Sequence, residues 1–280
     1  MVVVETGSME HSENRSFVGV IDTGDMVFIK KVGSHSDVTT YVEGRFVGKE
    51  KFGDFGDVIV FKKWGSDEHT PVIHRAMAYL EYNTTSNTFS IDKLEKLEEG
   101  KDYSFNSDRG SPRSSKGDVL VLHDVGYKRI NISIDFSFLE NSSNPHSGYI
   151  TMGDNNSPAV DQLSAGIINE TVRLEWIIGK GVLELPWFGL VKLSIQGFSK
   201  GTGLPNGVAS NSWLSLGITL ALLIVFPFVF DLVFSKVISA YKKRSNTCAM
   251  CEKTLDEHGD CPDCPVEEID LDKNPPEEKS

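Results

Sequence analysis

The stretch WLSLGITLALLIVFPFVF at residues 213–230 places the strongest single constraint on this chain of 280 residues. It contains 18 residues without a charged side chain, which is long enough for a helix to cross the hydrocarbon core of a bilayer. A buried core helix is the alternative interpretation. We predict one transmembrane helix over residues 213–235, kinked at Pro227.

The charges beside this stretch predict which way the helix crosses the lipid bilayer. Only three lysines occur between residues 180 and 212, whereas a basic cluster follows the helix, formed by Lys236, Lys242, Lys243 and Arg244. The positive-inside rule therefore predicts a cytoplasmic C-terminal tail. Residues 1–212 would lie outside, so we expect a protein of the cell (plasma) membrane whose main domain is extracytoplasmic.

Glycosylation sequons occur only before the predicted helix. Six N-x-[ST] triplets are present, at Asn14, Asn83, Asn131, Asn141, Asn155 and Asn169. Such triplets also arise by chance, but their placement on one side fits an external domain.

Charge is distributed unevenly along the chain. Residues 252–280 carry eleven of the 40 acidic residues and three lysines, so most of the net charge of −12 lies in the tail. We expect residues 266–280 to be acidic and disordered. Because no basic patch with interleaved aromatic residues is present, nucleic acid is not an expected partner.

Short β-rich segments recur in the first 200 residues. Three of them open with Gly-Asp, at residues 23–32, 55–64 and 116–125, and residues 129–139 alternate apolar and polar side chains. Gly-Asp is typical of a turn, and the β-branched run after it is typical of a strand. Residues 93–102 indicate one short helix, whereas 107–118 and 139–148 indicate loops. The sequence predicts a mostly β domain over residues 1–200, followed by a linker at 201–212.

Three residue types could supply nucleophilic catalysis. Ser8 follows Gly7, His74 lies on a predicted strand, and Asp154 and Asp161 lie in a polar loop. A serine with a base and an orienting acid is the arrangement that such chemistry requires. Each residue alone is more often structural, and His123 is best interpreted as an ordinary strand residue.

Several motifs, taken in order, resemble type I signal peptidase in its archaeal and endoplasmic-reticulum form. They are TGSMEH (6–11), TGDMVFIKK (23–31) with GDVIVFK (56–62), VIHRAM (72–77), ITMGDNNSPAVDQ (150–162) and IIGKGVLELPWFGLVKL (177–193). The resemblance implies a coiled β-sheet protease domain that cuts signal peptides from secretory preproteins. Residues 78–147 are longer than the family usually has there and would be an insertion.

The resemblance also implies roles for individual residues. Ser8 would be the nucleophile, His74 the general base, and Asp161 the acid that orients it, with Asp154 supporting the loop or sharing that role. The backbone N–H of Ser8 and the hydroxyl of Thr6 would form the oxyanion hole. Substrates would be preproteins with A-x-A-like cleavage sites. The family has a membrane helix just before the serine motif, so we expect about 20 apolar residues upstream of Met1.

The four cysteines follow the predicted helix, within a cytoplasmic segment at 236–265. Cys248, Cys251, Cys261 and Cys264 form two C-x-x-C pairs. This spacing predicts a four-thiolate zinc site resembling a zinc ribbon, with His258 as a less favoured ligand. Redox or unused pairs remain an alternative, and the tail would dock a cytoplasmic partner. The rival to the enzyme as a whole is a non-catalytic, membrane-anchored β-domain that binds a partner.

Overall fold

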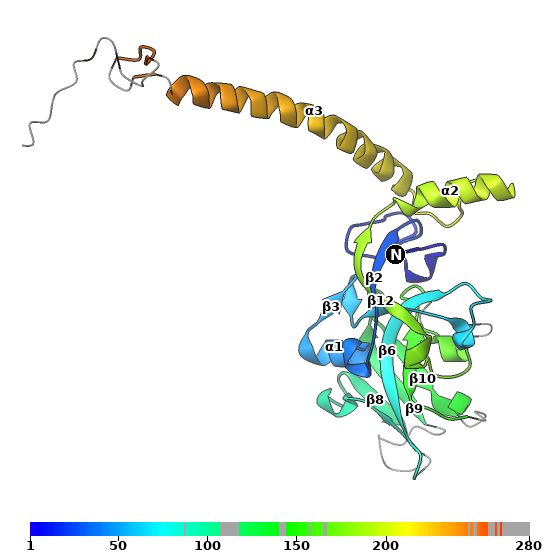
Figure 1. The fold of residues 1–280 in the computed structure, drawn as a ribbon. Coiled ribbons are helices and arrows are strands. Elements are labelled where there is room, and N and C mark those ends of the chain that lie inside the picture. Colours follow the sequence, from blue (N-terminus) through cyan, green and yellow to red (C-terminus); the bar gives the residue numbers. More distant parts are fainter. Residues whose placement is uncertain are drawn as a thin grey trace, which may run out of the picture. The chain divides into compact units, whose positions relative to one another are not determined.

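The computed structural model describes residues 1–86, 88–106, 118–139, 144–156, 158–164, 167–245, 247–248, 251–256, 261 and 264. The chain divides into two compact units, Met1–Gly217 and Ile218–Ser280. The first unit is mostly β, as predicted, and the described part of the second contains a long apolar helix and the cysteines. Figure 1 shows both units.

A curled antiparallel sheet forms the frame of the first unit (Figure 1). Its strands lie in the order β1, β2, β12, β5, β6 and β11, and β7 pairs with the second half of β6. The strands span Val2–Val3 (β1), Met26–Lys30 (β2), Val58–Phe61 (β5), Val72–Asn83 (β6), Thr88–Ile91 (β7), Gly148–Met152 (β11) and Ile177–Leu185 (β12). The pairing of β11 with β6 brings residues from the second half of this domain beside those from the first.

The first unit also contains two smaller sheets and the short helix α1. The strands β8 (Tyr103–Asn106), β9 (Val119–Val125) and β10 (Ile130–Asp135) form an antiparallel sheet in the order β10, β9, β8. The strands β3 (Glu50–Lys51) and β4 (Asp54–Phe55) form a hairpin, and α1 spans Tyr41–Val47. Thr40 caps α1 because its hydroxyl accepts a hydrogen bond from the N–H of Glu43.

The predicted Gly-Asp turns lead into strands β2 and β5. Gly24 and Gly56 both have positive φ, at +96° and +81°, a conformation that glycine adopts without steric cost. A Cβ on Gly56 would lie 2.6 Å from the backbone nitrogen of Tyr41, so the turn also needs a small residue for close packing. Both strands begin two residues after their glycine.

The largest apolar core contains side chains from the main sheet, the smaller three-stranded sheet and α1. Leu80, Leu120, Ile132 and Ile134 are fully buried there. Ile132 and Ile134 alternate with the exposed Asn131 and Ser133 on β10, as expected for a strand with one face against the core. Segment 78–147 therefore supplies much of this core.

The prediction of a short helix at 93–102 is wrong. The segment makes only one 3-10 turn, Leu94–Lys96, and the chain then bends at Gly100 into β8. Leu94 and Leu97 are both buried against the core, and this tertiary packing takes precedence over the local helical tendency.

The apolar segment near the C-terminus forms the helix α3, Ser212–Ser245, which is longer than the predicted span. Its part Ser212–Tyr241 is long and apolar enough to cross a membrane, and it continues through Pro227. Within the segment 201–212, Asn211 contacts the β domain, because its side-chain oxygen accepts a hydrogen bond from the N–H of Ser16.

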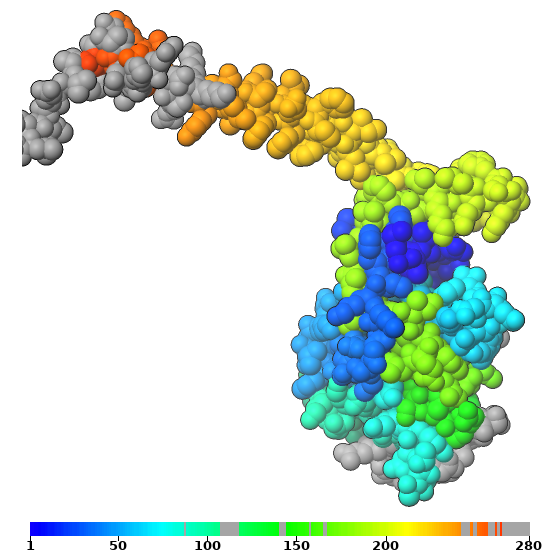
Figure 2. Space-filling view, in the orientation of Figure 1, coloured from blue at the N-terminus to red at the C-terminus, as the bar shows by residue number. Residues whose placement is uncertain are grey.

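A second helix, α2 (Gly189–Lys200), follows β12 and packs near the N-terminus of the chain. A Cβ on Gly189 would lie 2.7 Å from a methyl group of Val3, and Leu190 fills the space beside Gly24. In the space-filling view, the N-terminal residues (dark blue) lie beside the yellow-green segment that contains α2 (Figure 2). This packing fixes the start of the chain, where Ser8 lies.

Candidate active site

Ser8 lies in a 3-10 turn, Gly7–Met9, that begins shortly after β1. Met9 anchors this turn because its side chain is buried with Val4, Ile21 and Val27 in a small apolar cluster. The N–H of Glu10 donates to the carbonyl of Gly7 and closes the turn. Ser8 is therefore presented by a short, anchored segment of backbone.

His74 lies on β6 and contacts both Ser8 and Asp161. Its Nε2 is 2.9 Å from Ser8 Oγ, and its Nδ1 is 2.7 Å from Asp161 Oδ2. The imidazole side chain is only 5% exposed. With the proton on Nδ1 donated to Asp161, Nε2 is free to accept the hydroxyl proton of Ser8.

Asp161 begins the 3-10 turn Asp161–Leu163 and is fully buried. Its Oδ2 also accepts a hydrogen bond from the hydroxyl of Thr151 on β11, at 2.7 Å. The next residue, Gln162, accepts a hydrogen bond from the N–H of Thr151 and so fastens the turn to the same strand. Thr151 and Gln162 thus hold the carboxylate against His74, and no local sequence pattern singles out either residue.

Asp154 does not contact His74 but pairs with Arg75. The guanidinium donates to Oδ1 at 2.8 Å and to Oδ2 at 2.6 Å, and His11 Nε2 lies 2.9 Å from Oδ2. Burial alone would raise the pKa of Asp154, but the charge and hydrogen bonds of Arg75, with those of His11, lower that pKa to about 2. Of the two acids, Asp161 is the one that touches the imidazole.

Arg75 explains why Asp154 is held away from His74. Adjacent residues of a strand point to opposite faces, so the side chains of Arg75 and His74 lie on different faces of β6. Besides Asp154, the buried guanidinium donates to the carbonyls of Lys51, Phe52, Asp54, Phe55 and Gly56. This network ties the β3–β4 hairpin to the loop after β11.

Gly153 lets that loop approach the other site residues closely. A Cβ at this position would lie 2.6 Å from the carbonyl oxygen of Ser8 and 2.8 Å from His74 Nε2. It would also lie 2.9 Å from Asn156 Nδ2. Any side chain at 153 would therefore displace the groups that meet here.

A cavity of about 560 Å³ opens beside Ser8 and His74. Its apolar lining includes Val2, Val3, Val60, Val72, Ile73 and Ile167. The charged Glu5, Lys63 and Lys192 and the polar Thr6 and Asn156 also line it. Thr6 and Ser8 line the same cavity, and their oxyanion role stays a prediction. Another cavity, of about 540 Å³, is lined by α1 and the β3–β4 hairpin and contains charged groups such as Arg45 and Asp102, which pair with each other.

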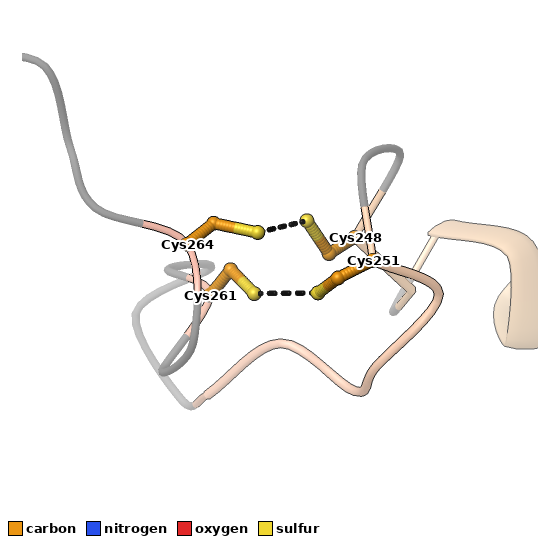
Figure 3. A group of neighbouring side chains, drawn as sticks. All are labelled: Cys248, Cys251, Cys261 and Cys264. Carbon is orange, nitrogen blue, oxygen red and sulfur yellow. Dashed lines mark hydrogen bonds between the residues drawn. The ribbon is translucent and has the colours of Figure 1, made fainter.

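The four cysteines of the second unit form a candidate metal centre (Figure 3). Their Sγ atoms all lie within 4.8 Å of one another, with Cys248 and Cys264 3.6 Å apart and Cys251 and Cys261 3.2 Å apart. These separations exceed a disulfide bond of about 2.05 Å. They approach the spacing of about 3.8 Å that a tetrahedron with Zn–S bonds of about 2.3 Å requires. The four thiols therefore fit a metal ion, and His258 lies outside the described residues.

No protein-family model matches the chain, and no curated protein matches its sequence.

Proposed function

We propose that the chain is a membrane-bound serine endopeptidase that removes signal peptides from secretory preproteins. The observation that carries this proposal is the hydrogen-bonded series from Ser8 through His74 to Asp161, with distances of 2.9 and 2.7 Å. A serine hydroxyl is a weak nucleophile unless a base lies within hydrogen-bond reach. His74 provides that base, because its Nε2 lies 2.9 Å from Ser8 Oγ.

In the proposed reaction, Ser8 Oγ attacks the carbonyl carbon of the scissile peptide while His74 Nε2 takes its proton. Asp161 stabilises the imidazolium that forms. The backbone N–H of Ser8 and the hydroxyl of Thr6 would donate to the oxyanion. His74 then protonates the leaving amine, and water hydrolyses the acyl-enzyme with His74 again as the base.

The cavity beside Ser8 supports a substrate with small apolar residues. Valine and isoleucine side chains line it, which suits the alanines of an A-x-A-like site. Strand β1 lies at an edge of the main sheet, so an extended substrate segment would form main-chain hydrogen bonds there.

The helix α3 would anchor the enzyme to the bilayer. Its length and apolar surface support the anchor, and the basic residues after it support a cytoplasmic tail. We assign the β domain to the outer side of the plasma membrane. The cysteine cluster would then lie on the reducing side, where thiols persist, bind zinc and dock a cytoplasmic partner.

Cleavage of a preprotein with an A-x-A junction by the full chain, in detergent micelles, tests the proposal. Ser8→Ala and His74→Ala should each lower kcat by about 10³-fold or more, because each removes a group that acts in the transition state. Ser133→Ala and His69→Ala, at exposed positions, are the matched controls. Undiminished cleavage by Ser8→Ala would refute the assignment.

The alternative of a non-catalytic surface protein predicts that these three residues lie far apart. Since Ser8 Oγ and His74 Nε2 are within hydrogen-bond distance, the geometry favours the peptidase.

A further inference from the structure

Asn155 makes two hydrogen bonds to the backbone that carries Ser8. Its own N–H donates to the carbonyl of Ser8 at 2.8 Å, and its side-chain Nδ2 donates to the carbonyl of Gly7 at 3.0 Å. The residue belongs to the loop after β11 and is half-buried. Asn155, which lies 148 positions after Gly7, thus holds the serine turn in place by hydrogen bonds.

The bond to the Gly7 carbonyl also fixes the direction of the Ser8 N–H. A peptide unit is planar and trans, so its carbonyl and its N–H point in opposite directions. Holding the Gly7 carbonyl towards Asn155 therefore holds the Ser8 N–H away from Asn155. This N–H is the donor that the proposed mechanism assigns to the oxyanion.

The turn between β9 and β10, residues 126–129, holds the other end of the Asn155 amide. The hydroxyl of Tyr127 donates to Oδ1 at 3.2 Å, and the ammonium of Lys128 donates to Oδ1 at 3.0 Å and to the Asn155 carbonyl at 3.1 Å. A flipped amide would turn Oδ1 towards the Gly7 carbonyl and its NH₂ towards the ammonium. The two donors therefore select the orientation in which Nδ2 faces Gly7.

The same turn is braced against the other side of the serine segment. The ring of Tyr127 stacks on the ring of His11, with centroids 4.4 Å apart and an interplanar angle of 18°. His11 in turn contacts Asp154, which is fixed by Arg75. Tyr127 thus contacts His11, which follows the serine turn, and Asn155, whose loop bonds to that turn.

We propose that Asn155, oriented by Tyr127 and Lys128, is a positioning residue that sets the Gly7–Ser8 peptide for oxyanion binding. The inference rests on the proposed function, because it concerns the same reaction. It gives the β9–β10 turn a part in catalysis, although the turn lies outside the motifs that carry the resemblance. It also requires Asn155 to be unglycosylated, because the glycan would occupy the nitrogen that holds Gly7.

Steady-state cleavage by the full chain separates this role from a structural one. Asn155→Asp keeps the acceptor for Tyr127 and Lys128 but removes the donor to Gly7, so kcat should fall about 10- to 100-fold with KM within about twofold. The double variant Tyr127→Phe/Lys128→Met should lower kcat about 3- to 10-fold. When the double variant is combined with Asn155→Ala, the fold-loss in kcat should be smaller than the product of the two separate fold-losses. Both changes act through the same contact between Asn155 and Gly7.

Hydrogen exchange provides a readout that does not depend on activity. In the Tyr127→Phe/Lys128→Met variant, the amides of Glu10 and Asn155 should exchange faster, since their acceptors are the carbonyls of Gly7 and Ser8. Lys101→Met is the matched control, because Lys101 pairs with Glu98 on an exposed surface.

The two proposals fail in different ways. If the wild-type protein and Ser8→Ala cleave equally, the proposed function is wrong, and hydrogen exchange still tests the contact. If the wild-type protein cleaves but the turn variant changes neither kcat nor exchange, the inference about Asn155 is wrong. A rise in KM with unchanged kcat would also overturn it, because that would indicate a role in substrate binding.

Discussion

Gly153 shows how much of the candidate site depends on the absence of a side chain. The alanine Cβ in Gly153→Ala would lie 2.6 Å from the Ser8 carbonyl and 2.8 Å from His74 Nε2. One of these groups must move, and small displacements of reacting groups are costly. We predict that kcat/KM for the preprotein falls at least about 10²-fold.

The control is Gly33→Ala, where the added methyl would meet only Asp37 Oδ2, at an ordinary 3.6 Å. This variant should keep full activity. Thermal unfolding of both variants would show whether Gly153→Ala is still folded. A folded Gly153→Ala protein with wild-type activity would contradict the close approach.

At the scale of elements, β12 places the buried carboxyl group of Glu184 near those of Asp22 and Asp25, which lie in the turn before β2. Glu184, Asp22 and Asp25 are at most 7% exposed, and burial raises their pKa values to about 7, 6 and 7. Asp22 also faces Glu10 and His11. In the unfolded chain these acids titrate near pH 4, so the folded state retains their protons to higher pH.

These raised pKa values predict a folded state that loses stability as pH rises. The protonated acids favour folding below about pH 4, and this contribution is lost between about pH 4 and 7, with a total on the order of several kcal/mol. Urea unfolding at pH 5 and pH 8 measures the difference. Glu184→Gln keeps an acceptor for the N–H of Gly19 and should reduce the loss.

Asp67→Asn, at an exposed position, is the control for this prediction and should leave the pH dependence unchanged. A stability that rises from pH 5 to pH 8 in the wild-type protein, with no change in Glu184→Gln, would contradict it.

The elements also show what could be predicted from sequence. Strands that alternate or follow Gly-Asp can be predicted, because burial of one face leaves a period of two in the sequence. The motifs placed Ser8, His74 and Asp161 as candidates. The supporting contacts of Thr151 and Gln162 with Asp161, and those of Arg75 with Asp154, follow from the pairing of β11 with β6, which no local pattern reveals.

At the scale of the whole molecule, a thiol reagent added to the intact protein would label the second unit selectively. All four cysteines of the chain lie in this cluster. If they bind zinc, the thiols of the intact protein should resist maleimide and react fully after chelation. We expect about one zinc released per chain and no change in preprotein cleavage, because the site lies in a separate compact unit.

Cys248→Ser should abolish the protection of the remaining thiols. Ser235→Ala, in α3, is the control and should leave both zinc content and labelling unchanged. Complete labelling of the protein isolated from zinc-supplied cells would contradict a metal site.

The long sequence separations within the candidate site have a consequence for folding order. Ser8 and His74 are 66 positions apart, His74 and Asp161 are 87 apart, and Gly7 and Asn155 are 148 apart. Contacts of such separation form late, because each must close a long loop. A chain growing from its N-terminus therefore lacks the Asp161 partner of His74 until residue 161 has been made. In the proposed peptidase, activity would arise only after residue 161 has been made and β11 has paired with β6, so the nascent chain would not cleave itself.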